Sequence, residues 1–289
     1  ANFAAYQAGE RDYTAVPAAN IDLVRGDPEL KKQIVQYARL VTYAAQFNFK
    51  KAPFDNVKVR QAFSTAIDRE AFVQKINKGV GHVAYSWIPP GMPGYQPDLG
   101  KEYKVDAAKA KKLLADAGYP DGKGLPPVSY SFADTGDNKL YAEFIQANLK
   151  DNLGVQIKLE PMESKAFSEA VNAGNWQMGF YGWGADYPDP DNFLPELFGT
   201  GAGNNNVNYS NKEFDDLVAK AMAEPDDGKR LQLWNQAQKK IVDDAVVIFL
   251  FNADRFGLLK PYVKGVVTTG MDHLAAGDRF MDKIYLSAH

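Results

Sequence analysis

The sequence has 289 residues and is 45% hydrophobic, so it is long enough to bury the core of one large domain or of two smaller ones. Its formal net charge of -3 argues against a nucleic-acid partner, and its longest apolar run, Ala245 to Phe251, is too short for a membrane-spanning helix, which needs roughly 20 residues. The lack of cysteine excludes disulfides and thiolate catalysis, and the three widely separated histidines give little support to a metal site or a Ser-His-Asp triad, so we expect no metal and no cofactor.

The first predicted elements are two helices separated by a loop. Apolar residues recur at helical spacing from Val57 to Gly79, and Asp106 to Gly118 has the pattern of a second amphipathic helix. Between them, the stretch from Trp87 to Gly100 is rich in proline and glycine, which favours a loop.

A β-α-β-α-β unit follows. Alternating apolar residues predict strands over 126–133, 155–162 and 176–183. A helix is predicted over 138–154, and a second helix, which Ser164 could cap, ends at Gly174.

The order of these elements predicts where a ligand would bind. Strands joined by helical crossovers are parallel, so their carboxyl ends share one edge of the sheet. The segments beyond these ends are Ala133 to Asp137, Pro161 to Ser164 and the stretch from Gly184 onward. Open α/β sheets bind ligands outside the carboxyl ends of their strands, so we expect Asp186 at the mouth of a crevice.

The rest of the chain continues the α/β pattern. Amphipathic helices are predicted over 212–223 and 227–243, and the stretch 246–267 is rich in strand signals. A loop is expected over 270–282 and a short strand over 283–289. The whole pattern indicates an α/β fold with a mixed, largely parallel sheet flanked by helices.

Five stretches together resemble the family 5 extracellular solute-binding proteins, which are the peptide, oligopeptide and nickel receptors of bacterial ABC importers. Their order and spacing across the chain carry the resemblance more than any one of them. The stretches are Phe47 to Val73, Trp87 to Tyr95, Asp106 to Gly124, "GWGADYPDPDNF" from Gly182 to Phe193, and Leu258 to Val266.

The resemblance implies a type II periplasmic-binding-protein-like fold with two lobes, of which this chain corresponds to the second half. Residues 1–42 would be a fragment of lobe I that leads to the hinge, and residues 43–248 would form lobe II, the ligand-binding lobe. Residues 249–289 would return to lobe I.

The resemblance also implies a receptor rather than an enzyme. Such a receptor clamps a peptide or another small solute between its lobes and presents it to the ABC permease of the cytoplasmic membrane. We expect the full receptor to be monomeric, and to be periplasmic or, as a lipoprotein, extracellular and membrane-anchored.

The resemblance assigns the ligand's ammonium group to the acidic residue of a "W.ADY" motif, which is Asp186 here. A desolvated carboxylate can form a charge-assisted hydrogen bond with an ammonium group. Trp183 offers a flat apolar wall beside it, and Gly184 lets a ligand approach the backbone next to Ala185. The alternative is a purely structural role, in which Asp186 only hydrogen-bonds its own turn.

The neighbouring acids have simpler explanations. The prolines around Asp189 and Asp191 favour a turn, and Asp191 could cap a helix over 192–198. The spacing of the three aspartates could suggest calcium, but it lacks the glycine and distal glutamate of the twelve-residue calcium loop.

Two departures from the family pattern concern ligand specificity. Ser164 stands where similar receptors often carry a Trp, and Val171 and Phe180 stand where some of them carry arginines for a peptide carboxylate. With these departures the anchor for a peptide carboxylate would be missing, and the pocket would suit longer peptides, other cationic solutes or sugars. Ser164 is a candidate ligand contact, although it could be only a helix cap. Asn205, in the run Asn204 to Asn206, is a second candidate polar contact, although this run could be only a loop.

Two rival functions remain open from the sequence alone. One is a hydrolase that uses Asp186 together with Glu160 or Glu163 as acid and base. The other is a receptor-derived sensor or interaction module with no role in transport.

Overall fold

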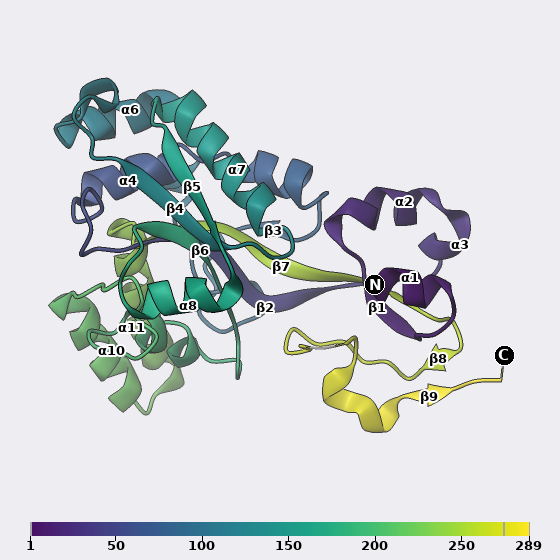
Figure 1. Ribbon diagram of the computed structural model, residues 1–289. Helices are drawn as coiled ribbons and strands as arrows, with labels where there is room; N and C mark the ends of the chain where they lie inside the picture. The colour runs from purple at the N-terminus through teal and green to yellow at the C-terminus, as the bar shows by residue number, and fades with distance from the viewer. Residues whose placement is uncertain (1, 274, 289) are drawn as a thin grey trace.

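The computed structural model describes residues 2–273 and 275–288. A larger α/β body and a smaller part lie side by side, and two long strands, β2 and β7, run from one into the other (Figure 1). The smaller part holds both ends of the described chain, since the first helices and the last strands gather there.

One mixed sheet organises the body. Its order is β1-β7-β2-β6-β4-β5, and β3 pairs with β7. The three strands of the predicted β-α-β-α-β unit are mutually parallel through β4, which confirms that their carboxyl ends share an edge, whereas β2 is antiparallel to both β6 and β7. The strands are β1 (Tyr13–Ala15), β2 (Ile34–Phe47), β3 (His82–Val83), β4 (Val128–Ala133), β5 (Ile157–Met162), β6 (Met178–Gly184), β7 (Val247–Leu259), β8 (Val263–Lys264) and β9 (Tyr285–Leu286).

Helices cover both faces of this sheet. α4, α6 and α7 pack over one face, and α8, α10 and α11 over the other, so the body has three layers (Figure 1). Phe214 in α10 and Trp234, Ala237 and Ile241 in α11 are buried, whereas Leu231 at the start of α11 is only partly buried. Both helices have the predicted bounds. The helices are α1 (Asn2–Gln7), α2 (Ile21–Gly26), α3 (Pro28–Lys31), α4 (Val57–Thr65), α5 (Arg69–Ala71), α6 (Ala107–Asp116), α7 (Asn138–Asn148), α8 (Ser164–Asn172), α9 (Pro195–Phe198), α10 (Lys212–Ala223) and α11 (Asp227–Asp243).

Some predicted helices have different bounds in the structure. The stretch 57–79 is not continuous: α4 ends at Thr65, and the Asp68 side chain accepts a hydrogen bond from the Ala71 backbone and starts α5. Ser164 does not cap α8, because the carboxylate of Glu163 accepts the backbone N–H groups of Lys165 and Ala166. A carboxylate at a helix start also faces the positive end of the helix dipole, which favours Glu163 as the cap.

The smaller part has a core of its own, in which Tyr6, Ile21, Val24 and Leu258 are buried together. The predicted loop over 270–282 contains a 3-10 helix, Asp278–Lys283, and the predicted final strand is the short β9; residues 274 and 289 lie outside the described residues. Within 2–273 and 275–288, no helix is long and apolar enough to cross a membrane.

Candidate functional site

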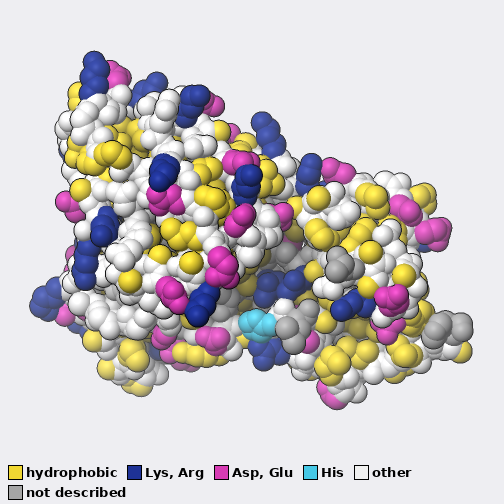
Figure 2. Space-filling view, viewed as in Figure 1, with side chains coloured by type: hydrophobic (Ala, Val, Ile, Leu, Met, Phe, Trp, Pro, Cys, Tyr) yellow, Lys and Arg dark blue, Asp and Glu magenta, His cyan; other side chains and the backbone are white. Residues whose placement is uncertain are grey.

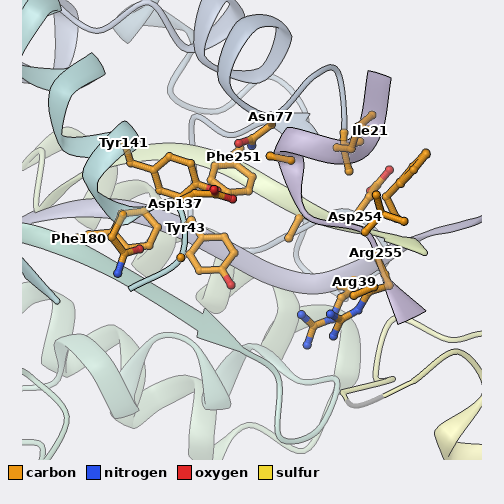
Figure 3. A pocket seen from close by; sticks show the side chains of 18 of the residues that line it. Ile21, Arg39, Tyr43, Asn77, Asp137, Tyr141, Phe180, Phe251, Asp254 and Arg255 are labelled. Atoms are coloured by element: carbon orange, nitrogen blue, oxygen red, sulfur yellow. The ribbon is translucent and has the colours of Figure 1, made fainter. Parts of the chain in front are cut away.

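A groove runs between the body and the smaller part, beside the carboxyl ends of β4 and β6. Figure 2 shows this hollow with Lys and Arg side chains and a histidine gathered in it. Its larger section has a volume of about 450 Å3 and lies between the turn Thr135–Asn138 and residues of the segment 15–21 (Figure 3). A second section of about 320 Å3 contains Asp186, and Arg39 and Tyr43 line both sections. The groove therefore lies at the edge that the strand order predicts.

Stacked aromatic rings form one wall of the groove. The ring of Tyr43 stacks on Phe180 at a centroid distance of 5.4 Å and on Phe251 at 4.9 Å, and Tyr141 packs against Phe180 at 5.1 Å. Gly182 permits this arrangement, because a Cβ atom at that position would collide with the Tyr43 ring. Burial raises the pKa of Tyr141, so its phenol is neutral. The wall suits the apolar side chains of a bound solute.

Asp186 follows β6 and is held by a buried asparagine, Asn192. Asn192 Oδ1 accepts the Asp186 backbone N–H at 2.9 Å and the Trp183 indole N–H at 3.3 Å, and Asn192 Nδ2 donates to Asp186 Oδ2 at 3.0 Å. Asp186 Oδ1 has no hydrogen-bond partner among the described residues, and the exposed carboxylate makes no ion pair with them. The side chain is thus oriented, while its charge is left for a ligand.

Asp189 and Asp191 make their contacts within the protein rather than in the groove. Arg230 donates two hydrogen bonds to the carboxylate of Asp189, at 2.8 and 2.7 Å, and the same carboxylate accepts the Asp191 backbone N–H. Asp189, not Asp191, therefore caps the 3-10 helix Pro190–Asn192, and α9 follows as a separate turn. Burial opposes the charge of Asp189, but the bonds from Arg230 prevail and lower its pKa; burial and the charge of Asp189 raise the pKa of Asp191.

Comparisons with known proteins agree with this geometry. A profile of the family described as "Bacterial extracellular solute-binding proteins, family 5 Middle" matches residues 1–205. The chain belongs to this family. It is 35% identical over 272 residues to "Heme-binding protein A" of Haemophilus influenzae, covering 92% of this chain and 49% of that protein. It is 32% identical over 295 residues to "Periplasmic oligopeptide-binding protein OppA" of Salmonella typhimurium, covering 98% and 52%.

Solved structures of the family share the fold. The murein tripeptide binding protein MppA of Escherichia coli superposes with a TM-score of 0.85 at 26% identity, covering 99% of this chain and 56% of that chain. Haemophilus influenzae OppA, solved in complex with the peptide RPPGFSPFR, gives 0.82 at 27% identity with the same coverage. The chain spans about half the length of the curated relatives it matches. The family consists of binding proteins of transporters.

The residues predicted for the family 5 site divide into two groups. Trp183, Gly184 and Asp186 line the smaller section of the groove. Ala185 is buried behind them and donates its backbone N–H to the Leu40 carbonyl at 2.9 Å. Four consecutive residues of the motif are therefore placed together, three in the groove and one below it.

Ser164 and Asn205 do not join this group. Ser164 is exposed as the first residue of α8 and lines neither section of the groove. Asn205 lies in a separate hollow with Asn48, which follows the end of β2 and therefore lies at the opposite edge of the sheet. Its side chain is bonded to the backbone of Gly199 and Tyr209, so it braces its own loop.

Neither glutamate of the hydrolase alternative shares the groove with Asp186. Glu163 is occupied as the cap of α8, and Glu160 on β5 forms an ion pair with Lys158 at 3.0 Å. β5 and β6 are separated by β4, which keeps Glu160 a strand away from β6. No cluster of three or more potential metal ligands occurs in the part of the chain that the structure describes.

Several groove residues were not predicted from the sequence, among them Arg39 and Arg255. They lie on β2 and β7, and each interrupts a strand that is otherwise mostly apolar or aromatic. A charged residue inside an apolar strand is a signal that could have identified both.

Proposed function

We propose that this chain contributes the solute-binding groove of an extracytoplasmic receptor that captures peptides for an ABC importer. The observation that carries the proposal is the carboxylate of Asp186, which Asn192 orients at the groove and which has no cationic partner among the described residues. A peptide ammonium group would supply that partner through a charge-assisted hydrogen bond. The aromatic wall around Tyr43 would receive the apolar parts of the peptide.

We propose a division into two lobes at the strands β2 and β7, which pass from one part into the other. Residues 43–248 would form lobe II, and residues 1–42 and 249–289 would belong to lobe I. The separate core around Tyr6 and Leu258 supports this division, as does the passage of β2 and β7 between the two parts. A change of angle along these strands would close the groove over a solute, and exclusion of water would strengthen its contact with Asp186.

Membership of the family supports a proposal for the partners and the location. We propose a non-catalytic receptor that delivers its solute to a permease of the cytoplasmic membrane and has no nucleic-acid partner. It would act as a monomer in the periplasm, or on the outer face of the membrane through a lipid anchor.

Thermal unfolding with and without peptides tests the proposal. The protein is expressed from its whole reading frame and heated with a library of random tripeptides or with the same library acetylated at the amino terminus. We expect the free peptides to raise Tm and the acetylated peptides to have little effect, because a ligand at about 100 times its Kd adds about 2.7 kcal/mol of stability.

Two variants separate the site from its surroundings. Asp186→Asn should abolish the peptide-induced shift, whereas Asp189→Asn, which removes the same charge three residues away, should preserve it. Equal shifts with acetylated peptides would contradict the contact between Asp186 and the ammonium group, and no shift with either library would contradict peptide capture. Cleavage of the peptides, detected by mass spectrometry, would contradict a non-catalytic receptor.

A further inference from the structure

Two arginines face the groove from neighbouring strands. Arg39 on β2 and Arg255 on β7 both line its larger section, and Arg255 is paired in register with Tyr37. Figure 3 shows their guanidinium groups beside each other, on the side of the groove that leads toward the smaller part. Burial and then the charge of Arg255 lower the pKa of Arg39, as expected for two adjacent cations.

The charge of this pair is not neutralised within the described chain. Arg39 Nε donates to the backbone carbonyl of Asp272 at 3.1 Å, and Arg255 Nη2 donates to the carbonyl of His273 at 2.6 Å. Neither arginine forms an ion pair with a described residue, and the buried Nε of Arg255 has no hydrogen-bond partner among those residues.

The nearby carboxylates are turned to other partners. Both oxygens of the buried Asp272 accept hydrogen bonds from Thr269, and one of them also accepts the Gly277 backbone N–H. Asp254 accepts from Gln36 at 2.8 Å and lies 3.4 Å from His82 Nε2. The arginine pair therefore keeps its positive charge.

The surrounding phenols add donors without adding negative charge. Tyr13 and Tyr37 lie near both arginines, and burial raises the pKa of each tyrosine. Their hydroxyl groups are thus neutral and able to donate. Partly buried charges without partners are costly in a folded protein, and a planar guanidinium matches a carboxylate with two parallel hydrogen bonds.

We propose that Arg39 and Arg255 form a subsite for a carboxylate of the bound solute. The inference rests on the proposed function and narrows it: the solute is a zwitterion whose ammonium group faces Asp186 and whose carboxylate faces the arginine pair. Because Arg39 and Asp186 line the same section of about 320 Å3, the two charges of the solute are separated by no more than a short peptide. The carboxylate is either the peptide terminus or an acidic side chain.

Competitive retention of peptides tests the subsite. The protein from its whole reading frame is mixed with random tripeptides bearing a free terminal carboxylate and with the same library as terminal amides. Bound peptides are recovered by gel filtration and identified by mass spectrometry. The proteins compared are the wild type, Arg39→Gln, Arg255→Gln and the control Arg11→Gln, which removes an exposed arginine that lines neither section of the groove.

We expect the wild type and Arg11→Gln to retain the free acids at least about tenfold over the amides, the difference expected for one charge-assisted hydrogen bond. The ratio should approach one in Arg39→Gln and Arg255→Gln. If either glutamine variant fails to fold, the lysine variant at the same position should fold and give an intermediate ratio, since lysine keeps the charge but lacks the planar fork.

The remaining outcomes are distinct. Enrichment of Asp and Glu among retained amides, lost in Arg39→Gln, would support the subsite and identify a side-chain carboxylate as its ligand. Equal retention of acids and amides, without such enrichment and unchanged in the glutamine variants, would overturn the subsite and leave peptide capture standing. Retention of neither library would overturn peptide capture and the subsite with it.

Discussion

Asp186 and Asp189 stand three residues apart in one loop, yet their surroundings differ. The carboxylate of Asp189 accepts hydrogen bonds from both Nη atoms of Arg230, and about 31% of the Asp189 side chain is exposed. Asp186 receives only the neutral amide of Asn192 and faces the groove. The first carboxylate is neutralised within the protein, whereas the second is oriented and left charged.

The partner that orients each carboxylate decides whether its charge is available to a ligand. An ion pair inside a loop fixes the conformation of that loop and leaves little charge for a ligand. A carboxylate held by a neutral donor keeps its geometry as well as its charge, which is what recognition of an ammonium group requires. Arg39 and Arg255, held by carbonyl oxygens, repeat this arrangement with the opposite sign.

Asn192→Ala should have the largest effect, because Asn192 orients Asp186. The substitution removes the acceptor of two donors, the Asp186 backbone N–H and the Trp183 indole N–H, at a position that is only 5% exposed. We expect a loss of about 3 kcal/mol in the free energy of unfolding, measured by urea denaturation. Peptide affinity should fall as well, because Asp186 loses its orientation; an unchanged affinity would show that Asn192 is only structural.

Gly182→Ala should weaken binding without touching either carboxylate. Its added Cβ would displace the Tyr43 ring from between Phe180 and Phe251. We expect a destabilisation of about 1–2 kcal/mol and a loss of affinity for peptides with large apolar side chains. Binding titrations with triphenylalanine and trialanine would separate the two effects, since an equal loss for both peptides would point to a general distortion of the fold.

Much of the fold could be predicted because it depends on local patterns. The alternation in Val128–Ala133 and the apolar spacing of Asp227–Asp243 specify their elements without knowledge of the rest of the chain. The parallel unit then fixed one edge of the sheet, so the placement of Asp186 followed from connectivity.

The groove as a whole could not be predicted in this way. Arg39 and Arg255 meet only because β2 pairs with β7 across a large separation in sequence, and a shift in register near Ala38 and Thr42 interrupts that pairing. The periodicity of a strand identifies it as a strand but does not say which distant strand it pairs with. Asn205 illustrates the same limit: its residue type suits a ligand contact, but its loop lies at the opposite edge of the sheet from the groove.

Asp189→Asn should have the smallest effect on stability, and that effect should depend on pH. The substitution keeps the oxygen that accepts the Asp191 backbone N–H and loses the ion pair with Arg230, so we expect about 1 kcal/mol of destabilisation at neutral pH. Since Arg230 lowers the pKa of Asp189 in the folded protein, the pair stabilises the fold above the ordinary aspartate pKa of about 3.9. That stability is lost as the pH falls through the lowered pKa.

Urea denaturation should therefore show that the wild type is more stable than Asp189→Asn by a constant amount from about pH 7 to about pH 5, and by less below about pH 4. A difference that persists in strong acid would mean that Asp189 acts through packing rather than through its charge.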